Sequence, residues 1–145
     1  MQVLYHSSRF SPLNMRVNLW DTDGTFYSAD FTGVYIRHQS TSYLLEVTQH
    51  IDGLGGLDGG LTTYQSQVKF STFDNLPEED ANRNCAVQHG TGWWFLYSDQ
   101  CFTSLLTGTP NKDVTQPGAL TWSGISKPVA KAKVYARPLF MNESK

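Results

Sequence analysis

The sequence has few charged residues and no excess of either sign. Charged side chains make up 17% of the 145 residues, and 11 basic against 13 acidic residues give a net charge of −2. Proteins that bind nucleic acid or anionic membranes by charge need a basic surface patch, so this balance argues against both kinds of partner. The sequence also lacks an apolar run as long as a bilayer span, which argues against membrane insertion.

Cysteine is scarce too. Cys85 and Cys101 are the only two, and neither lies in a CxxC or Cys/His metal-binding pattern, which leaves a disulfide or two free thiols. A bridge between them would stabilise the fold by roughly 3 kcal/mol and would favour an oxidising, extracellular location. Asn142 begins a glycosylation sequon, which fits secretion. Residues 1–10 lack the basic and apolar regions of a signal peptide, so we expect a secreted form to be a fragment or an excised domain.

The regular elements that the residue pattern predicts are strands. Alternating or β-branched and aromatic residues predict strands at 16–20, 25–27, 33–37, 43–47, 67–72 and 133–138. Asp23-Gly24 is typical of a hairpin turn, so the first strands are expected to form an antiparallel meander. No segment carries a long amphipathic helical stripe. We therefore predict an α+β fold with an antiparallel central sheet and few short helices.

The stretch 70–108 holds both cysteines, the Trp93-Trp94 pair and the densest acidic cluster. Two adjacent indole rings are costly to leave in water, so at least one is expected to pack beneath a bridge between the cysteines. The glycine cluster at 52–60 does not have the GxGxxG spacing of a phosphate-binding loop, and we predict a loop there.

Five short patterns are informative together: Phe70-Ser71-Thr72, Asn84-Cys85-Ala86, Trp93-Trp94, Cys101 and Arg137-Pro138. They resemble the fibrinogen-related domain, the C-terminal globular domain of fibrinogen chains, ficolins, tachylectins, angiopoietins and tenascins. Within the family, the run 85–94 is most similar to the fibrinogen gamma chain. Residues 15–21 match the family's strand before an Asn-Gly or Asp-Gly turn. The resemblance covers nearly the whole chain from about residue 15.

The resemblance implies a single domain over 1–145 with a Cys85–Cys101 disulfide. It implies a central sheet subdomain in 1–69, a loop-rich, disulfide-stapled binding subdomain in 70–132, a strand returning to the sheet at 133–138 and a tail at 139–145. The family has a further N-terminal subdomain, so we expect an uncovered sheet edge here, which invites pairing with another chain. An oligomerising upstream region would be a second route to an oligomer.

The family binds calcium in the loop after Phe-Ser-Thr, through the oxygen ligands that suit this hard cation. The resemblance implies a weak calcium site built from Asp74, Glu78, Glu79 and Asp80. Leu76-Pro77 stands where the family has its first carboxylate ligand, and one residue is inserted between Phe70 and Cys85. A solvated acidic loop is therefore the alternative interpretation.

The family's ligand pocket lies beside that loop. It receives an acetyl group in lectin-like members and a peptide amino terminus in the fibrinogen gamma chain. The corresponding positions here are His89 and Phe102, and a longer lip at 95–100 adds Tyr97 and Asp99. The ligand-binding residues that we predict are Gln88, His89, Tyr97, Asp99, Phe102 and Thr115. Asp99 is the candidate to hold an ammonium group by charge, which imidazole and phenyl rings cannot do. The alternative is that His89 and Phe102 only pack around the bridge.

The residues 21–25 spell DxDGT, the nucleophile sequence of haloacid-dehalogenase-like phosphatases. Those enzymes need a parallel sheet with crossover helices, for which this sequence has no helical segments. The alternative is a hairpin turn with two exposed carboxylates. The four histidines show no metal-ligand spacing, and we predict no catalytic residue.

Together these features predict extracellular, non-enzymatic recognition. The first hypothesis is a protein-interaction module that binds a receptor or a chain terminus through the loops around the disulfide. The second is a calcium-assisted lectin for acetylated sugars, of the ficolin or tachylectin kind that serves innate immunity. A phosphatase is a distant third. The expected partner is thus an extracellular protein or glycan.

Overall fold

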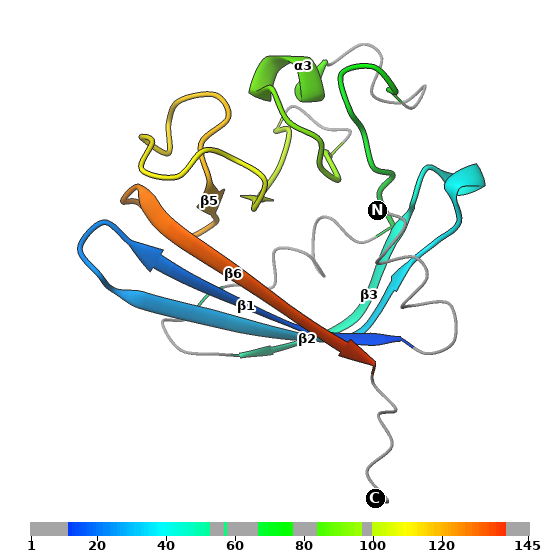
Figure 1. Cartoon of the computed structure of the whole chain (residues 1–145), viewed down its shortest axis with the longest axis horizontal. Helices are drawn as coiled ribbons and strands as arrows, with labels where there is room; N and C mark the ends of the chain where they lie inside the picture. Colours follow the sequence, from blue (N-terminus) through cyan, green and yellow to red (C-terminus); the bar gives the residue numbers. More distant parts are fainter. Residues whose placement is uncertain (1–11, 53–56, 58–66, 77–83, 97–99, 139–145) are drawn as a thin grey trace, which may run out of the picture.

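The structure, a computed structural model, describes residues 12–52, 57, 67–76, 84–96 and 100–138. In the described part of the chain, a four-stranded sheet lies on one side and a layer of loops with one short α-helix lies on the other (Figure 1). The strands are β1 (Leu13–Asp21), β2 (Phe26–Ile36), β3 (Leu45–Asp52) and β6 (Val129–Pro138). Their order is β3-β2-β1-β6, with every neighbouring pair antiparallel, so the predicted sheet is confirmed. Among the helices that the structure describes, none is long and apolar enough to cross a membrane.

The β1–β2 hairpin is closed by the carboxylate of Asp21. This side chain is 4% exposed. It accepts hydrogen bonds from the backbone N–H of Asp23 at 2.9 Å, the N–H of Thr25 at 3.0 Å and the hydroxyl of Tyr27 at 3.1 Å. An aspartate that binds the backbone two residues further on stabilises a turn. The expectation of two exposed carboxylates is therefore wrong for Asp21, which folds inward to hold the turn, and right for Asp23.

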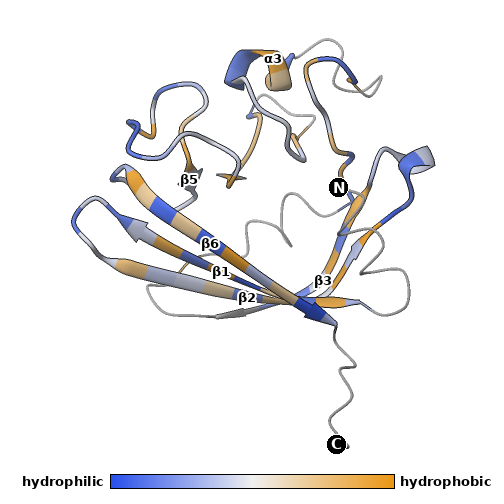
Figure 2. Cartoon of the chain, viewed as in Figure 1, coloured by the Kyte–Doolittle hydropathy of each residue, from blue (hydrophilic) through white to orange (hydrophobic). Residues whose placement is uncertain are grey.

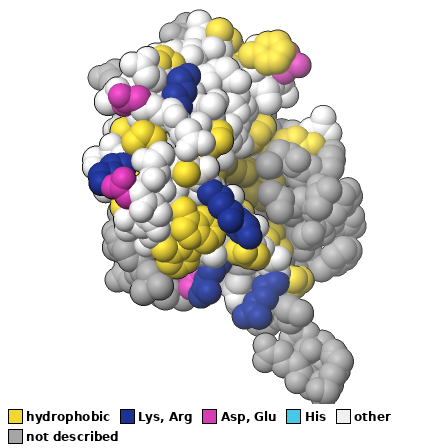
Figure 3. Space-filling model, turned by 60° about the vertical axis from the view of Figure 1, so that its left-hand side comes forward, with side chains coloured by type: hydrophobic (Ala, Val, Ile, Leu, Met, Phe, Trp, Pro, Cys, Tyr) yellow, Lys and Arg dark blue, Asp and Glu magenta, His cyan; other side chains and the backbone are white. Residues whose placement is uncertain are grey.

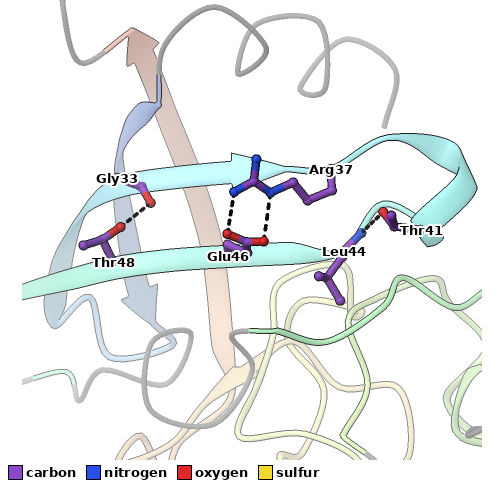
Figure 4. Close-up of polar contacts among 6 residues, drawn as sticks. All are labelled: Gly33, Arg37, Thr41, Leu44, Glu46 and Thr48. Carbon is purple, nitrogen blue, oxygen red and sulfur yellow. Dashed lines mark hydrogen bonds and ion pairs between the residues drawn. The ribbon is translucent and has the colours of Figure 1, made fainter.

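β2 is one continuous strand, whereas the sequence predicts two separate strands in this region, at 25–27 and 33–37. A bulge near Gly33 shifts the pairing with β1 between Leu13 and Met15. Gly33 has φ +64°, and a Cβ there would lie 2.5 Å from the hydroxyl oxygen of Thr48 on β3. That hydroxyl donates to the carbonyl oxygen of Gly33 at 3.0 Å (Figure 4). The close approach explains why the strand can continue through this position only with glycine.

The turn between β2 and β3 contains a single 3₁₀ turn, η1 (Gln39–Thr41). The guanidinium group of Arg37 donates two parallel hydrogen bonds to the carboxylate of Glu46 (Figure 4). The Nε–Oε1 distance is 2.8 Å and the Nη2–Oε2 distance is 2.6 Å. β3 begins at Leu45, later than predicted, because Ser42 and Tyr43 have positive φ angles of 57° and 51° that interrupt extended backbone.

Two other predicted strands differ from the structure. The segment 67–72 forms no regular strand and makes only isolated bridges, which join Val68 to Leu45, Ser71 to Trp93 and Thr72 to Asn75. It crosses from the edge of β3 to the loop layer, so it cannot follow either neighbour for long. β6 begins at Val129, earlier than the predicted start at residue 133.

The hydrophobic core lies between the inner face of the sheet and the loop layer. Apolar side chains alternate with polar ones along β1 and β2, as the banded colouring in Figure 2 shows. Phe31 on β2 contacts Trp122 on β5 (Thr121–Trp122), which pairs with β4 (Ser104–Leu105); the two ring centroids are 5.9 Å apart. Trp93 and Trp94 are both buried, at 5% and 6% exposure, as expected for at least one of them.

Candidate functional site

A disulfide joins the two walls of the candidate site. Cys85 and Cys101 are bonded with an S–S distance of 2.13 Å, as the resemblance implied. Cys85 is the first residue of α3 (Cys85–His89), and Cys101 directly precedes Phe102. α3 ends at Gly90, whose φ of 70° allows its N–H to donate to the carbonyl of Ala86 at 2.9 Å. The bridge therefore holds α3 against the segment that follows Cys101.

His89 lies at the end of α3 and contacts two other segments. Its Nδ1 accepts a hydrogen bond from the backbone N–H of Gly118 at 2.9 Å. Its ring lies edge-on to Phe102, with centroids 4.8 Å apart, and is stacked on Phe95 at 6.1 Å. Burial, with a smaller contribution from the charge of Lys112, lowers the pKa of His89. The accepted hydrogen bond requires an unprotonated Nδ1, so the neutral ring carries its proton on Nε2.

The third segment of the site comprises residues 113–118, and Gly118 allows it to approach α3. It has φ +77°, and a Cβ there would lie 2.6 Å from the carbonyl oxygen of His89. No other residue fits this position without moving backbone. Upstream, Asp113 Oδ1 accepts hydrogen bonds from the N–H of Thr115 at 2.9 Å and from its hydroxyl at 2.8 Å. Both bonds favour the charged carboxylate and lower the pKa of Asp113.

These three segments line an open pocket of about 340 Å³, which we call the α3 pocket. It is lined by Gln88, His89, Gln100, Cys101, Phe102, Val114, Thr115, Gln116 and Pro117. The structure thus brings together Gln88, His89, Phe102 and Thr115 from the predicted set. Tyr97 and Asp99 lie outside the described residues. Gln100 lies in the predicted lip at 95–100, whereas the sequence alone did not indicate Val114, Gln116 or Pro117 as lining residues.

The described lining of the α3 pocket carries no charged side chain. The side chains of Phe102, Val114 and Pro117 are apolar, whereas the glutamine amides each offer donors and an acceptor. The amide oxygen of Gln88 lies 3.9 Å from Sγ of Cys101, so this side chain lies beside the disulfide. A pocket of this composition suits an uncharged group that has one apolar part and one hydrogen-bonding part.

The predicted calcium ligands are only partly within the described chain. Asp74 lies at an exposed turn in which Thr72 and Asn75 exchange backbone hydrogen bonds of 3.2 and 3.1 Å. Its Oδ1 accepts a hydrogen bond from the hydroxyl of Thr72 at 2.7 Å. Glu78, Glu79 and Asp80 lie outside the described residues, as does Asn142. In the part of the chain that is described, no group of three His, Cys, Asp or Glu side chains could hold a metal.

The sequence is similar to fibrinogen gamma chains from two vertebrates. The Mus musculus fibrinogen gamma chain is 27% identical over 144 residues, covering 92% of this chain and 32% of the mouse protein. The Petromyzon marinus fibrinogen gamma chain is 30% identical over 104 residues, covering 65% of this chain and 23% of that protein. The chain therefore spans about a third of the length of the mouse protein and 23% of the length of the lamprey protein.

Solved structures share the fold. The fibrinogen-like globe domain of human ANGPTL6 has a TM-score of 0.79 at 23% identity, covering 95% of this chain and 62% of that one. The lamprey fibrin D-dimer, solved with the peptide Gly-His-Arg-Pro-amide, has a TM-score of 0.75 at 18% identity, covering 99% of this chain and 51% of that one.

The family model for the C-terminal globular domain of fibrinogen beta and gamma chains matches residues 2–139. Its members are extracellular, non-enzymatic binding modules that are typically secreted and often bind calcium. The DxDGT sequence is accordingly a hairpin turn and not a phosphatase site. Because the match extends over nearly the whole sequence, the chain belongs to the fibrinogen C-terminal globular domain family.

Proposed function

We propose that this domain is a secreted recognition module that binds a peptide segment of an extracellular protein in the α3 pocket. The observation that carries the proposal is the uncharged lining of that pocket, in which apolar side chains and amides lie side by side. A peptide presents paired N–H and C=O groups together with apolar side chains, which this lining can accept. The peptide bound to the lamprey fibrin D-dimer, a protein of the same fold, supports a peptide ligand.

The pocket composition also bears on which part of a peptide would bind. An amino terminus carries a positive charge, and the described lining offers no carboxylate to pair with it. Burial of an unpaired ammonium group is costly. An internal or blocked peptide segment is therefore the favoured ligand, and Asp99 is the candidate residue for binding a free terminus.

A second candidate function is supported by the same lining. The methyl of an acetyl group could pack on Phe102 beside His89, whose rings lie edge-on at 4.8 Å, while a glutamine amide donates to the acetyl carbonyl. This would make the domain a lectin for acetylated sugars. Calcium would assist through a site built from Asp74 and the acidic residues at 78–80.

A selection from a random eight-residue peptide library distinguishes these functions, followed by calorimetric titration of the selected peptides and of N-acetylglucosamine. Phe102→Asp places a charge in the pocket, and Thr115→Arg blocks its exposed rim without touching the core. Val87→Asp is the matched control, because Val87 lies on α3 but is exposed and does not line the pocket. We expect both pocket variants to weaken peptide binding by about tenfold or more, and the control to retain it.

Three outcomes would contradict peptide recognition at this site. One is the absence of any selected peptide, and another is peptide binding that both pocket variants retain. The third is binding of N-acetylglucosamine alone with loss in the pocket variants, which would establish the lectin function instead. Circular dichroism of each variant separates loss of binding from loss of folding, and Thr115→Arg keeps the test decisive if Phe102→Asp does not fold.

The calcium proposal has its own test. A ligand that binds only the native state raises the melting temperature. We expect a higher melting temperature with calcium than with a chelator, and we expect Asp74→Asn to reduce the difference. An unchanged melt would leave the acidic loop as a solvated surface.

A further inference from the structure

The three walls of the α3 pocket meet at one side chain, that of His89. It is the last residue of α3, and its ring lies edge-on to Phe102, with centroids 4.8 Å apart. Its Nδ1 accepts a hydrogen bond of 2.9 Å from the backbone N–H of Gly118, a buried residue of the third segment. A change at this ring therefore acts on all three segments that line the pocket.

The hydrogen bond between Gly118 and His89 exists in one charge state of the ring only. Neutral imidazole can accept at Nδ1, whereas a protonated ring carries an N–H on both nitrogens. Protonation would thus place two N–H donors opposite each other, and a buried backbone N–H without an acceptor is costly. The two segments are in direct contact here, since a Cβ on Gly118 would lie 2.6 Å from the carbonyl oxygen of His89. Loss of the bond would therefore separate the third segment from α3.

The surroundings of the ring do not favour a positive charge. The rest of α3 and the segments 93–96 and 100–106 contain no charged side chain. Most of the loop layer visible in the upper part of Figure 3 is likewise white or yellow, with isolated Lys, Arg, Asp and Glu side chains. The rings of Phe95 and Phe102, which pack against His89, are apolar. A charged imidazole would therefore have little compensation within the described part of the site.

The third segment and the residue before it bring two charged groups to this region. Nζ of Lys112 donates a hydrogen bond to the carbonyl of Pro117, and its positive charge helps to lower the pKa of His89. Asp113 has the opposite charge, but its carboxylate accepts two hydrogen bonds from Thr115, which lower its pKa. Asp113 therefore stays charged where His89 titrates, so His89 is the group that changes charge in this region.

We propose that protonation of His89 opens the α3 pocket between α3 and the third segment, so that the domain releases its ligand when the surroundings become acidic. The inference rests on the proposed function, because it concerns regulation of the same pocket. Burial lowers the pKa of His89 below its ordinary value of 6.5, so the ring is neutral and the pocket closed at neutral pH. Affinity then falls as the pH falls through the pKa of the free protein, by at most about tenfold per pH unit for one proton.

The first test needs no ligand. NMR spectroscopy of the ¹⁵N-labelled protein follows the ring nitrogens of His89 and the amide of Gly118 between about pH 5 and 7.5. We expect both to change with the same midpoint. The hydrogen-exchange protection factor of the Gly118 amide should fall below that midpoint, while amides of β1 keep theirs and so exclude global unfolding.

The second test measures affinity over the same pH range by calorimetric titration. The probes are N-acetylglucosamine and a library-selected peptide with blocked ends and without His, Asp or Glu, so that neither probe titrates. The native protein should lose roughly tenfold in affinity for the bound probe between about pH 7.5 and 5.

Three variants assign this loss to the ring. His89→Asn keeps a side-chain oxygen that can accept from Gly118 but does not titrate, so its pH profile should be flat. Lys112→Gln removes a nearby positive charge, so the midpoint should move to higher pH. His38→Gln, at an exposed position in the turn between β2 and β3, is the matched control and should keep the native profile.

Each contrary result has a definite meaning. A flat native profile, tighter binding in acid, or the native profile in His89→Asn would overturn acid release but leave the proposed function intact. A Gly118 amide that does not follow the titration of His89 would overturn the mechanism whatever binds. Absence of binding by both probes at neutral pH would overturn the proposed function and this inference together. Lys112→Gln keeps the test decisive if His89→Asn does not fold, because an unmoved midpoint would also contradict the proposal.

Discussion

The sheet and the loop layer are stabilised in different ways. The sheet has three long antiparallel ladders and a core face built from alternate apolar residues, so its stabilising contacts are many and similar. The described loop layer has one five-residue helix, one pair of two-residue strands and a small number of specific contacts. These include the disulfide and the hydrogen bond from Gly118 to His89. The conformation of the loop layer therefore depends on contacts made by single residues, and so does the shape of the α3 pocket.

The largest effect is expected where the two layers meet. Trp122 is 0% exposed and its ring contacts Phe31 of the sheet. Trp122→Ala should lower the free energy of unfolding by about 4 kcal/mol, because a large buried side chain is lost and a cavity remains. Urea denaturation measures this. Trp20→Ala, on the half-buried outer face of β1, is the control, and an equal loss there would contradict the assignment of the core to the inner face.

The second prediction concerns the disulfide. Cys85→Ala with Cys101→Ala should destabilise the protein by roughly 3 kcal/mol and abolish binding in the α3 pocket. Hydrogen exchange should show that amides of β1 and β2 remain more protected than those of α3. Equal loss of protection in both layers would show that they unfold as one unit, and the comparison between them would fail.

A glycine substitution tests the third wall of the pocket. Gly118→Ala should cost about 2 kcal/mol, since φ is positive and the new Cβ would meet the His89 carbonyl. Gly124→Ala is the matched control: its φ is also positive, at +93°, but nothing lies within 4 Å of the new Cβ. We expect a smaller loss for the control in thermal or urea unfolding, with ligand binding preserved. Equal losses would mean that backbone strain alone decides the cost.

The smallest effect is a pH dependence that originates in the loop layer. Burial lowers the pKa of His89 from its ordinary value of 6.5, so the folded state binds fewer protons at this site than the unfolded state. This contribution to stability is complete above pH 6.5 and decreases as the pH falls through the range between the unfolded and folded pKa values.

Unfolding free energies measured at several pH values between about 5 and 7 test this dependence. His89→Phe keeps a ring against Phe102 but removes the titrating group. The variant should be less stable at neutral pH and should show a flatter profile over this range. An unchanged pH profile would contradict a role for His89.

Much of the sheet could be predicted because its signals are local. Alternation along β1 and the Asp23-Gly24 turn fix a hairpin within a few residues, and the structure has both. The continuity of β2 could not be predicted, since Gly33 is accommodated by Thr48 from another strand. The segment 67–72 has the composition of a strand, but its position between two neighbours allows only single bridges.

The sequence by itself determined the strand-forming segments, the hairpin turn and the family, because each depends on residues close together in the chain. Its resemblance to the family also indicated Gln88, His89, Phe102 and Thr115. Only the tertiary structure decided that Val114, Gln116 and Pro117 line the third wall of the α3 pocket beside Thr115. The wall depends on a contact between His89 and Gly118, 29 residues apart. This contact is not encoded in a local pattern.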